Sequence, residues 1–422
     1  MPPEVVIPLN SVWLVTAAIL VFFMQAGFAL VESGMVRAKN AVNVIMKNYC
    51  DMCVGAIGFW AIGYGLMFGL NTTGWYGTDK FFMNSSVPWD YSLLFFQMMF
   101  AATAATIVSG ALAERIRFNA YLIGSFLITT LLYPTFGSWV WNEGGWLRKM
   151  GFLDFAGSSV VHSVGAWCAL AGILALGPRL GRYAKDGTPR EIPGHNLPFV
   201  AIGGFILWFG WFGFNSGSTA EANPDIGKIA LNTHLAGTAA VVSTILLRSL
   251  TGRPPLLGAI VNGSLGGLVS ITAGCAYVSP GAAVLIGGAA AFIIPIGNAV
   301  IDALKLDDAV GAIPVHGFCG VWGTLAVGVF KDGMPDPTQI GIQALGCATA
   351  FVFVFPTAYC MYRVIGWATE LRVRSIDEQR GLDFAEHEEV GYPEFQEDLL
   401  HGGTKPEYLH TATSDYAFSG RN

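Results

Sequence analysis

The chain has 422 residues, of which 53% are hydrophobic and only 12% are charged, with a net charge of −6. The charged share is about half of the roughly 25% that soluble domains carry, which argues against a water-soluble globular protein. No run of Lys or Arg forms a basic patch, so no nucleic acid is expected as a partner.

Eleven apolar stretches are long enough to cross about 30 Å of hydrocarbon at about 1.5 Å per residue. In chain order they are residues 10–33, 41–69, 91–112, 119–141, 156–177, 197–216, 227–250, 255–276, 280–302, 311–330 and 338–367. They predict an all-α integral membrane protein that crosses the lipid bilayer eleven times.

The basic residues of the connecting segments predict which side each end of the chain faces. Eleven lie after odd-numbered spans and five after even-numbered spans, and cytoplasmic loops are the ones enriched in Lys and Arg. We therefore expect a multi-pass protein of the cytoplasmic membrane with its N-terminus outside and its C-terminus inside. The first residues lack the positive segment of a signal peptide, so the first span is expected to be retained.

Charge divides the chain at residue 370. Residues 1–370 carry 18 basic and 18 acidic side chains, whereas residues 371–422 carry 5 and 11. We interpret 1–370 as a membrane domain and 371–422 as a cytoplasmic C-terminal tail. The tail is hydrophilic and is expected to be a docking segment that is partly disordered after about residue 397.

Ionisable groups at membrane depth are costly and are therefore candidates for function. Lys47 and Asp51 are four residues apart on one predicted helix and are expected to pair with each other in a structural role. Glu114 and Glu32 lie near Arg residues at cytoplasmic helix ends and are expected to act as caps or anchors. Cys50 and Cys53 form an isolated CxxC, so no metal or cofactor is predicted.

One nine-residue motif occurs twice, reading D-x-x-G-x-x-x-V-H from Asp154 to His162 and from Asp308 to His316. The copies open the fifth and tenth spans, which enter the bilayer from opposite faces, as in an inverted repeat with its site at the repeat interface. Eight helical residues place each His about 12 Å inward. In a core about 30 Å thick the two rings then lie near the midplane, within reach of each other.

Two neighbouring neutral imidazoles supply a donor and an acceptor in a dry passage and can share a proton. A metal site is the competing interpretation, but two His without a third ligand make a poor one. His234 has no counterpart in the repeat and is expected to be an ordinary core residue.

Aromatic residues form a second signal near the outer ends of the third, fourth and sixth spans. They include Phe100, Trp141 and Phe214, and Ser218 follows the last of them. The simplest interpretation is an interfacial belt. The alternative is a vestibule that captures a small cation on ring faces and a hydroxyl, since cation–π attraction strengthens to about 2 kcal/mol when the site is desolvated.

The chain resembles the Amt/Mep/Rh family of ammonium transporters over nearly its whole length. The motifs that carry the resemblance are Gln25–Gly34, Gly63–Gly69, Asp154–Gly157, Gly194–Pro198, Trp208–Ser218, Val315–Gly320, Leu371–Val373 and Gly381–Asp383. The resemblance implies eleven helices in two inverted halves of five, assembled as a homotrimer with one pore in each subunit.

The resemblance also implies roles for individual residues. Phe100, Trp141 and Ser218 match the external ammonium-recruitment site, with Asp154 supporting recruitment and deprotonation, and Phe100 and Phe214 match the rings that close the pore. His162 and His316 match the twin-histidine pair, and Asp308 is assigned a structural role. We expect NH4+ to lose a proton near the rings and to cross as NH3 along the pair.

Two departures from the family pattern bear on these expectations. The tail element His387–Tyr392 resembles the family motif that implies docking of a PII-type regulator, but Glu388 stands where a Gly is usual. A PII-type regulator is therefore one possible partner that the resemblance implies. His234 stands where relatives often have Asn and, with Pro314, is expected to alter the pore locally.

Ammonium sensing is the alternative function, because some relatives join this module to a signalling domain such as a histidine kinase or a diguanylate cyclase. A passive gas pore is disfavoured because Trp141 and Ser218 keep the cation-capture pattern. The sequence contains no hydrolase, nucleotide-binding or nucleophile motif, so an enzyme is not expected.

Overall fold

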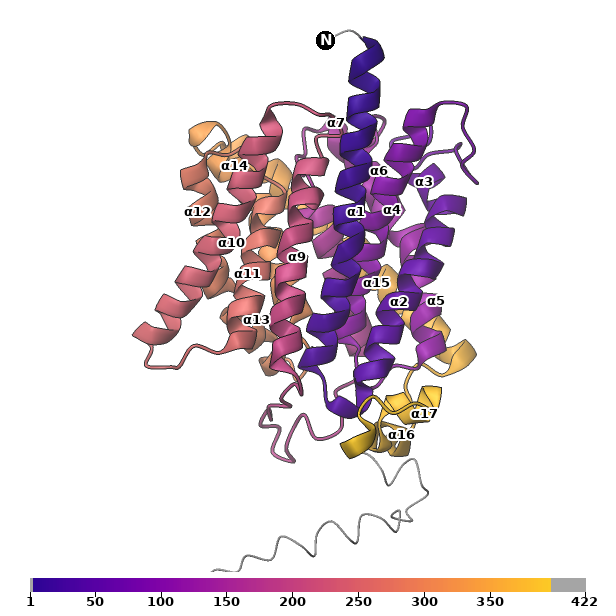
Figure 1. Ribbon diagram of the computed structural model, residues 1–422, viewed down its shortest axis with the longest axis vertical. Helices are drawn as coiled ribbons and strands as arrows, with labels where there is room; N and C mark the ends of the chain where they lie inside the picture. Colours follow the sequence, from indigo (N-terminus) through magenta and orange to yellow (C-terminus); the bar gives the residue numbers. More distant parts are fainter. Residues whose placement is uncertain (1–2, 396–422) are drawn as a thin grey trace, which may run out of the picture.

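A computed structural model describes residues 3–395, and within that range the chain forms helices and no β-strand (Figure 1). The α-helices are α1 (Pro3–Met35), α2 (Ala41–Gly58), α3 (Tyr64–Phe68), α4 (Pro88–Ala111), α5 (Phe118–Leu127), α6 (Tyr133–Trp141), α7 (Trp146–Lys149), α8 (Val164–Leu176), α9 (Leu197–Gly217), α10 (Asp225–Leu250), α11 (Leu257–Thr272), α12 (Pro280–Gly288), α13 (Ala290–Ala303), α14 (Cys319–Phe330), α15 (Pro337–Thr369), α16 (Ser375–Arg380) and α17 (Leu382–His387). The predicted all-α membrane fold is confirmed.

Several spans contain π-helical turns, in which one extra residue per turn redirects the side chains. These turns are η2 (Phe59–Gly63), η3 (Ile128–Leu132), η4 (Ser158–Ser163) and η5 (Ile313–Phe318). The 3-10 turns are η1 (Ala38–Asn40), η6 (Lys331–Gly333) and η7 (Pro393–Phe395). Two of the π-helical turns, η4 and η5, carry the histidines of the repeated motif.

Within residues 3–395, ten helical segments are long and apolar enough to cross a membrane. Each agrees with a predicted span to within a few residues at most of its ends. The eighth predicted span corresponds to α11, whose 16 residues fall short of the roughly 20 that a spanning helix needs. Ten of the eleven predicted crossings are therefore confirmed by length, and the eleventh stays a prediction.

The helices of the two halves of the chain lie side by side, with α1 and α9 adjacent at the middle (Figure 1). Glycines allow these two helices to approach closely. A Cβ added to Gly203 would lie 2.6 Å from the carbonyl oxygen of Gly27, and one added to Gly27 would lie 3.1 Å from that of Gly203. Such small-residue contacts are typical of helix packing in membranes, where lipid offers no hydrophobic drive.

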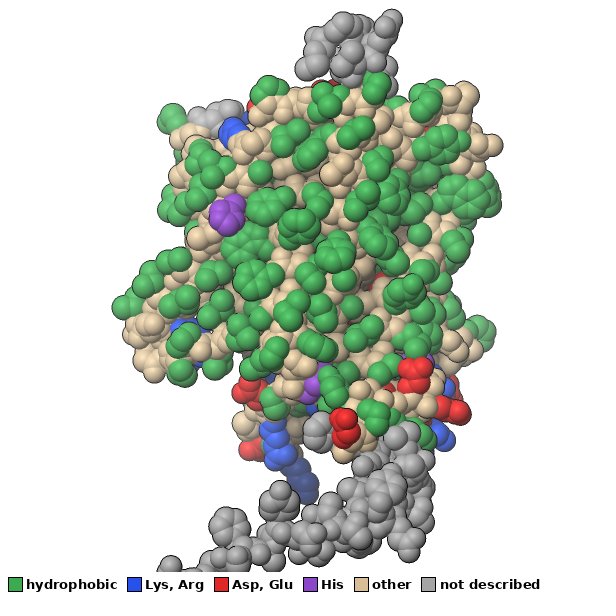
Figure 2. All heavy atoms as spheres, viewed as in Figure 1, with side chains coloured by type: hydrophobic (Ala, Val, Ile, Leu, Met, Phe, Trp, Pro, Cys, Tyr) green, Lys and Arg blue, Asp and Glu red, His purple; other side chains and the backbone are tan. Residues whose placement is uncertain are grey.

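Charged side chains gather mainly at one end of the molecule, whereas the lateral face in view is largely hydrophobic (Figure 2). We call this charged end the tail end, because α16 and α17 lie there, opposite the start of α1 (Figure 1). The hydrophobic sides between the two ends fit a surface that contacts lipid.

The tail folds back on the helix ends as far as Tyr392. The amide of Asn43 donates to the Asp383 carboxylate at 2.8 Å, and the Nε2 of His387 lies 2.9 Å from the Nδ2 of Asn43. His195 Nε2 contacts the Tyr392 hydroxyl at 2.8 Å. Burial raises the pKa of Asp383 and lowers the pKa of His387. The disorder expected after about residue 397 lies outside the described residues.

Candidate functional site

The two motif histidines meet in the middle of the helix bundle. Nδ1 of His162 lies 3.3 Å from Nδ1 of His316, and the two rings are nearly parallel at 22°. Both side chains are buried. Because two neutral imidazoles form a hydrogen bond only when one nitrogen donates and the other accepts, this contact defines a directional pair.

Each histidine is placed by an aspartate that caps the π-helical turn containing it. Asp154 accepts bonds from the amides of Gly157, Ser158, Ser159 and Val160 and from the Ser159 hydroxyl. Asp308 accepts bonds from the amides of Val310, Gly311 and Ile313. The first amide groups of a helix lack partners within the helix, and a carboxylate accepts their hydrogen bonds. Its negative charge is also stabilised by the positive end of the helix dipole.

Aromatic rings continue the histidine pair toward the end opposite the tail. His162 stacks on Phe214 at 5.4 Å between ring centroids, and Phe214 stacks on Phe100 at 4.0 Å. Trp141 meets Phe100 edge-on at 6.1 Å. The order Trp141, Phe100, Phe214, His162, His316 therefore forms a continuous column of rings, and we call it the ring column.

A wide vestibule of about 980 Å³ opens above this column. Trp141 and Ser218 line it, and acidic side chains from Asp79, Glu143 and Glu221 stand around it with the bases Lys80 and Arg148. Trp141 is held by a 2.7 Å hydrogen bond from its Nε1 to the main-chain oxygen of Asp154. The structure thus brings two of the four predicted recruitment residues to the vestibule, with Phe100 directly beneath them.

Asp154 lies away from the vestibule. Its side chain is buried, and both carboxylate oxygens point into the first turn of η4. Asp154 therefore caps its π-helical turn just as Asp308 does, although the sequence analysis predicted a structural role for Asp308 only. Any influence of Asp154 on a cation therefore acts through space or through the position of His162.

Lys47 and Asp51 do not form the ion pair predicted from their spacing, and this expectation is corrected by the structure. The Lys47 ammonium donates to the main-chain oxygen of Ser109 at 3.2 Å and lies over the Tyr121 ring. Asp51 accepts hydrogen bonds from the hydroxyls of Tyr121 and Thr106. Tyr121, seventy residues further along the chain, therefore stands between them, and each charge finds its own partner.

His234 is not the core residue that the sequence predicted. It is exposed on the side of α10, against the rings of Trp208 and Phe212, and lies away from the ring column. The expectation that it alters the pore is therefore wrong. The prediction of a core residue failed because, in a membrane protein, hydropathy does not separate the outer side of a helix from its core-facing side.

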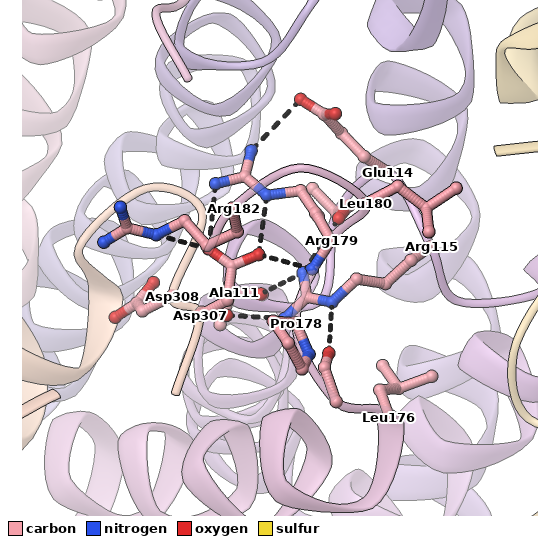
Figure 3. A network of polar contacts seen from close by, with 12 residues as sticks. Ala111, Glu114, Arg115, Leu176, Pro178, Arg179, Leu180, Arg182, Asp307 and Asp308 are labelled. Atoms are coloured by element: carbon pink, nitrogen blue, oxygen red, sulfur yellow. Dashed lines mark hydrogen bonds and ion pairs between the residues drawn. The ribbon is translucent and has the colours of Figure 1, made fainter. Parts of the chain in front are cut away.

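A network of ion pairs ties the second motif to the tail end (Figure 3). Arg179 donates to the Asp307 carboxylate at 2.8 Å and to Glu114 at 3.2 Å, and Arg115 donates to the main-chain oxygen of Asp307 at 2.5 Å. Burial alone would raise the pKa of Asp307, but Arg179 and Arg115 outweigh it and hold that pKa at about 2. Asp307 directly precedes Asp308, so this network anchors the start of η5.

Two residues of the site were missed by the sequence reasoning. Trp211 stacks on His162 at 5.1 Å and is fixed by a 2.9 Å hydrogen bond from its Nε1 to the Thr272 hydroxyl. Glu32 lines a cavity next to His316. The Trp208–Ser218 motif contained a signal for Trp211, whereas no spacing rule points to Glu32.

Comparisons with known proteins bear on the family of this chain. The family model described as Ammonium Transporter Family matches residues 12–392. The ammonium transporter Amt2 of Archaeoglobus fulgidus is 44% identical over 419 residues, covering 92% of this chain and 89% of the relative. A putative ammonium transporter of Synechocystis is 42% identical, covering 90% of this chain and 73% of the relative.

Solved structures match as well. A structure named Sensor Amt Protein has a TM-score of 0.88 and 40% identity and covers 91% of this chain and 99% of its own. The crystal structure of Mep2 from Candida albicans has a TM-score of 0.81 and 28% identity, with 88% and 87% covered. The chain therefore belongs to the ammonium transporter family.

Proposed function

We propose that this protein transports ammonium across the cytoplasmic membrane by taking up NH4+ in the vestibule, removing one proton near the rings and conducting NH3 along the histidine pair. The observation that carries the proposal is the ring column, which joins the vestibule to two hydrogen-bonded imidazoles. Membership of the ammonium transporter family supports the substrate.

The vestibule fits the capture of a small cation. Trp141 and Ser218 line the same opening, and the Ser218 hydroxyl, which donates to the main-chain oxygen of Phe214, has an oxygen that also accepts hydrogen bonds. The carboxylates of Glu143 and Glu221 add negative charge at the same opening. A ring face and an oxygen acceptor attract ammonium as it loses part of its water.

The stacked rings oppose the passage of a hydrated ion. Phe100 and Phe214 are fully buried and lie 4.0 Å apart between ring centroids, which leaves no space for water between them. A monovalent cation that leaves water without new partners loses many kcal/mol. Ammonium escapes this penalty by giving up a proton, whereas potassium has none to give, and this difference supplies selectivity.

The histidine pair is suited to conduct the neutral molecule and to relay a proton. Among the described residues, Nε2 of His162 is buried without a hydrogen-bond partner, next to Phe214. A buried polar atom that lacks a partner needs an explanation. We propose that this nitrogen meets ammonia once it has passed the rings, while Nδ1 passes a proton toward His316.

We propose that residues 1–370 form the transport domain and that the tail from 371 docks on its cytoplasmic side, with the N-terminus outside. The docked contacts of Asp383 and His387 support a role of the tail in control of transport. A homotrimer and a PII-type regulator are the expected partners, and only the family resemblance supports them.

Ammonium sensing is the second candidate, favoured by one observation. The structure named Sensor Amt Protein shares 40% identity with this chain over 91% of its length. The same pore residues serve a sensor that binds ammonium without rapid transport.

One electrical measurement separates these functions. The purified protein is placed in liposomes on a solid-supported membrane and exposed to steps of ammonium or potassium. We expect a transient current with ammonium and none with potassium. Absence of an ammonium current from correctly folded protein that still binds ammonium would favour the sensor.

A further inference from the structure

Beyond His316 the ring column opens into a small cavity toward the tail end. Its volume is about 30 Å³, and its lining is largely aliphatic, with His316, Asn262 and Glu32 as the polar members. A volume of this size holds about one or two water molecules or one ammonia. Glu32 is therefore an ionisable group on the path that a molecule takes after leaving the histidine pair.

The contacts of Glu32 place its carboxyl group among polar partners, beside the cavity next to His316. Glu32 is 3% exposed; its carboxylate accepts a 2.8 Å hydrogen bond from Nδ2 of Asn48, hydrogen-bonds with Ser109 and the main chain of Gly110, and lies near the positive charge of Lys47. From the sequence we expected Glu32 to serve as a cap or anchor near Arg37, but Arg37 pairs with Glu114 instead. Charge at membrane depth is costly, and Lys47 is the nearby positive charge that compensates a carboxylate at Glu32.

A glycine and several ionisable groups surround the Glu32 side chain. A Cβ added to Gly110 would lie 3.0 Å from the Glu32 carboxyl carbon, so the absence of a side chain there gives the carboxyl group room. The other ionisable groups packed near it are Lys47 and Asp51 on α2 and His316 across the cavity. Lys47 also donates to the main-chain oxygen of Ser109 and Asp51 accepts from the Thr106 hydroxyl, and neither residue lines the cavity.

We propose that Glu32 is the proton-transfer residue at the inner end of the pathway, where it returns a proton to ammonia. Ammonia enters the cavity past His316, and its lone pair takes the proton of the Glu32 carboxylic acid. One N–H bond forms and one O–H bond breaks, which leaves NH4+ beside a carboxylate. The ion pair offsets the cost of forming a cation inside the membrane.

The carboxylate then recovers a proton as ammonium leaves toward the tail end. The proton removed outside reaches it through His162 and His316 and the water of the cavity, so one NH4+ taken up yields one NH4+ released. This inference rests on the proposed function, because it needs ammonia to arrive from the histidine pair.

The test compares E32Q with D51N in proteoliposomes. Gln keeps the shape and the bond from Asn48 but holds no transferable acid proton. Asp51 is an equally buried carboxylate of the same region that does not line the cavity, so D51N controls for loss of a buried acid. We expect E32Q to lower the ammonium current about 100-fold, the low end of what a positioned proton donor contributes, and D51N to leave it unchanged.

A solvent-isotope comparison adds a signal that a merely structural role would not give. If proton return becomes limiting, the ratio of currents in H2O and D2O is larger in E32Q than in the wild type. Should E32Q not be recovered as monodisperse protein, E32D replaces it, and its shortened carboxyl group is expected to lower the current less strongly but measurably.

The outcomes separate the two proposals. A wild-type protein without ammonium current refutes the proposed function. A wild-type current that E32Q and E32D both retain in full refutes the role of Glu32 and leaves the proposed function standing. An equal loss in E32Q and D51N also overturns the role, because it assigns the effect to the buried polar region as a whole.

Discussion

In the first half of the chain, Asp154 and η4 carry His162 toward two stacked rings, whereas in the second half Asp308 and η5 carry His316 toward a cavity lined by Glu32. The local construction is the same, since an aspartate caps a π-helical turn that holds a histidine. The surroundings differ, because buried aromatic rings pack against the first histidine, whereas a cavity with a carboxyl group in its lining lies next to the second. Under the proposed function, the two copies differ through the residues that pack against them and not through the motif itself.

The sharpest contrast is at the residue before each aspartate, which is Leu153 in one copy and Asp307 in the other. We expect D307N to lower the free energy of unfolding by about 3 kcal/mol, the low end for a broken buried ion pair, because it removes the closer carboxylate of buried Arg179 and leaves only Glu114. Thermal unfolding of the purified protein, read by tryptophan fluorescence, measures this loss. L153N, the matched change in the first copy, breaks no ion pair and serves as the comparison.

The pH dependence of that contribution follows from the lowered pKa of Asp307. A carboxylate with a depressed pKa stabilises the fold above its ordinary range near 3.8 and loses this effect as pH falls through about 2. The difference between wild type and D307N should therefore be constant from pH 5 to 8. A difference that disappeared within that window would contradict the ion-pair account.

Removal of both imidazoles tests the shared middle of the two halves. H162L combined with H316L keeps the volume roughly constant but removes the relay. Without the imidazoles, a proton in the pore has no partner, which raises the barrier to its passage by a few kcal/mol. Since about 1.4 kcal/mol corresponds to a factor of ten, we expect an ammonium current at least about 100-fold smaller. An unchanged ammonium current would show that the pair carries no proton.

The two capping aspartates allow a graded comparison. An Asn in place of the Asp has an NH2 group where a carboxylate oxygen accepted hydrogen bonds, so some backbone amides lose their acceptor. Each unsatisfied buried group costs about 1–3 kcal/mol of stability. Asp154 accepts five hydrogen bonds and Asp308 three. We expect D154N to lower the melting temperature more than D308N, as measured by differential scanning fluorimetry. The reverse order would mean that the caps are not the main task of these residues.

The smallest expected effect concerns the docked tail. Burial depresses the pKa of His387 in contact with Asn43, so docking is favoured above its ordinary value of 6.5 and weakens as pH falls. Glu386, Glu389 and Lys47 are the charged groups around it. The protection factors of the tail amides, which are exchange rates corrected for the base-catalysed intrinsic rate at each pH, should be smaller at pH 5.5 than at pH 7.5, and H387N should remove most of this difference.

The sequence predicted the parts of the molecule that depend on long hydrophobic runs or on repetition. The spans and the meeting of His162 with His316 were predicted because both follow from length and from a motif that occurs twice. The π-helical turns were not predicted, since one extra residue in a uniformly apolar helix changes no visible period. Tyr121 between Lys47 and Asp51, and Glu32 facing the cavity, depend on contacts between distant helices that spacing along one helix cannot show.

The most direct test of the central claim is solid-state NMR of the protein in lipid bilayers with ¹⁵N-labelled histidine. We predict two neutral imidazoles at pH 7, one with a protonated Nδ1 and one with a bare Nδ1, coupled across their hydrogen bond and both lost in the H162L and H316L double variant. Two separate rings without this coupling, or a stable imidazolium at neutral pH, would contradict a dry histidine pair that conducts ammonia.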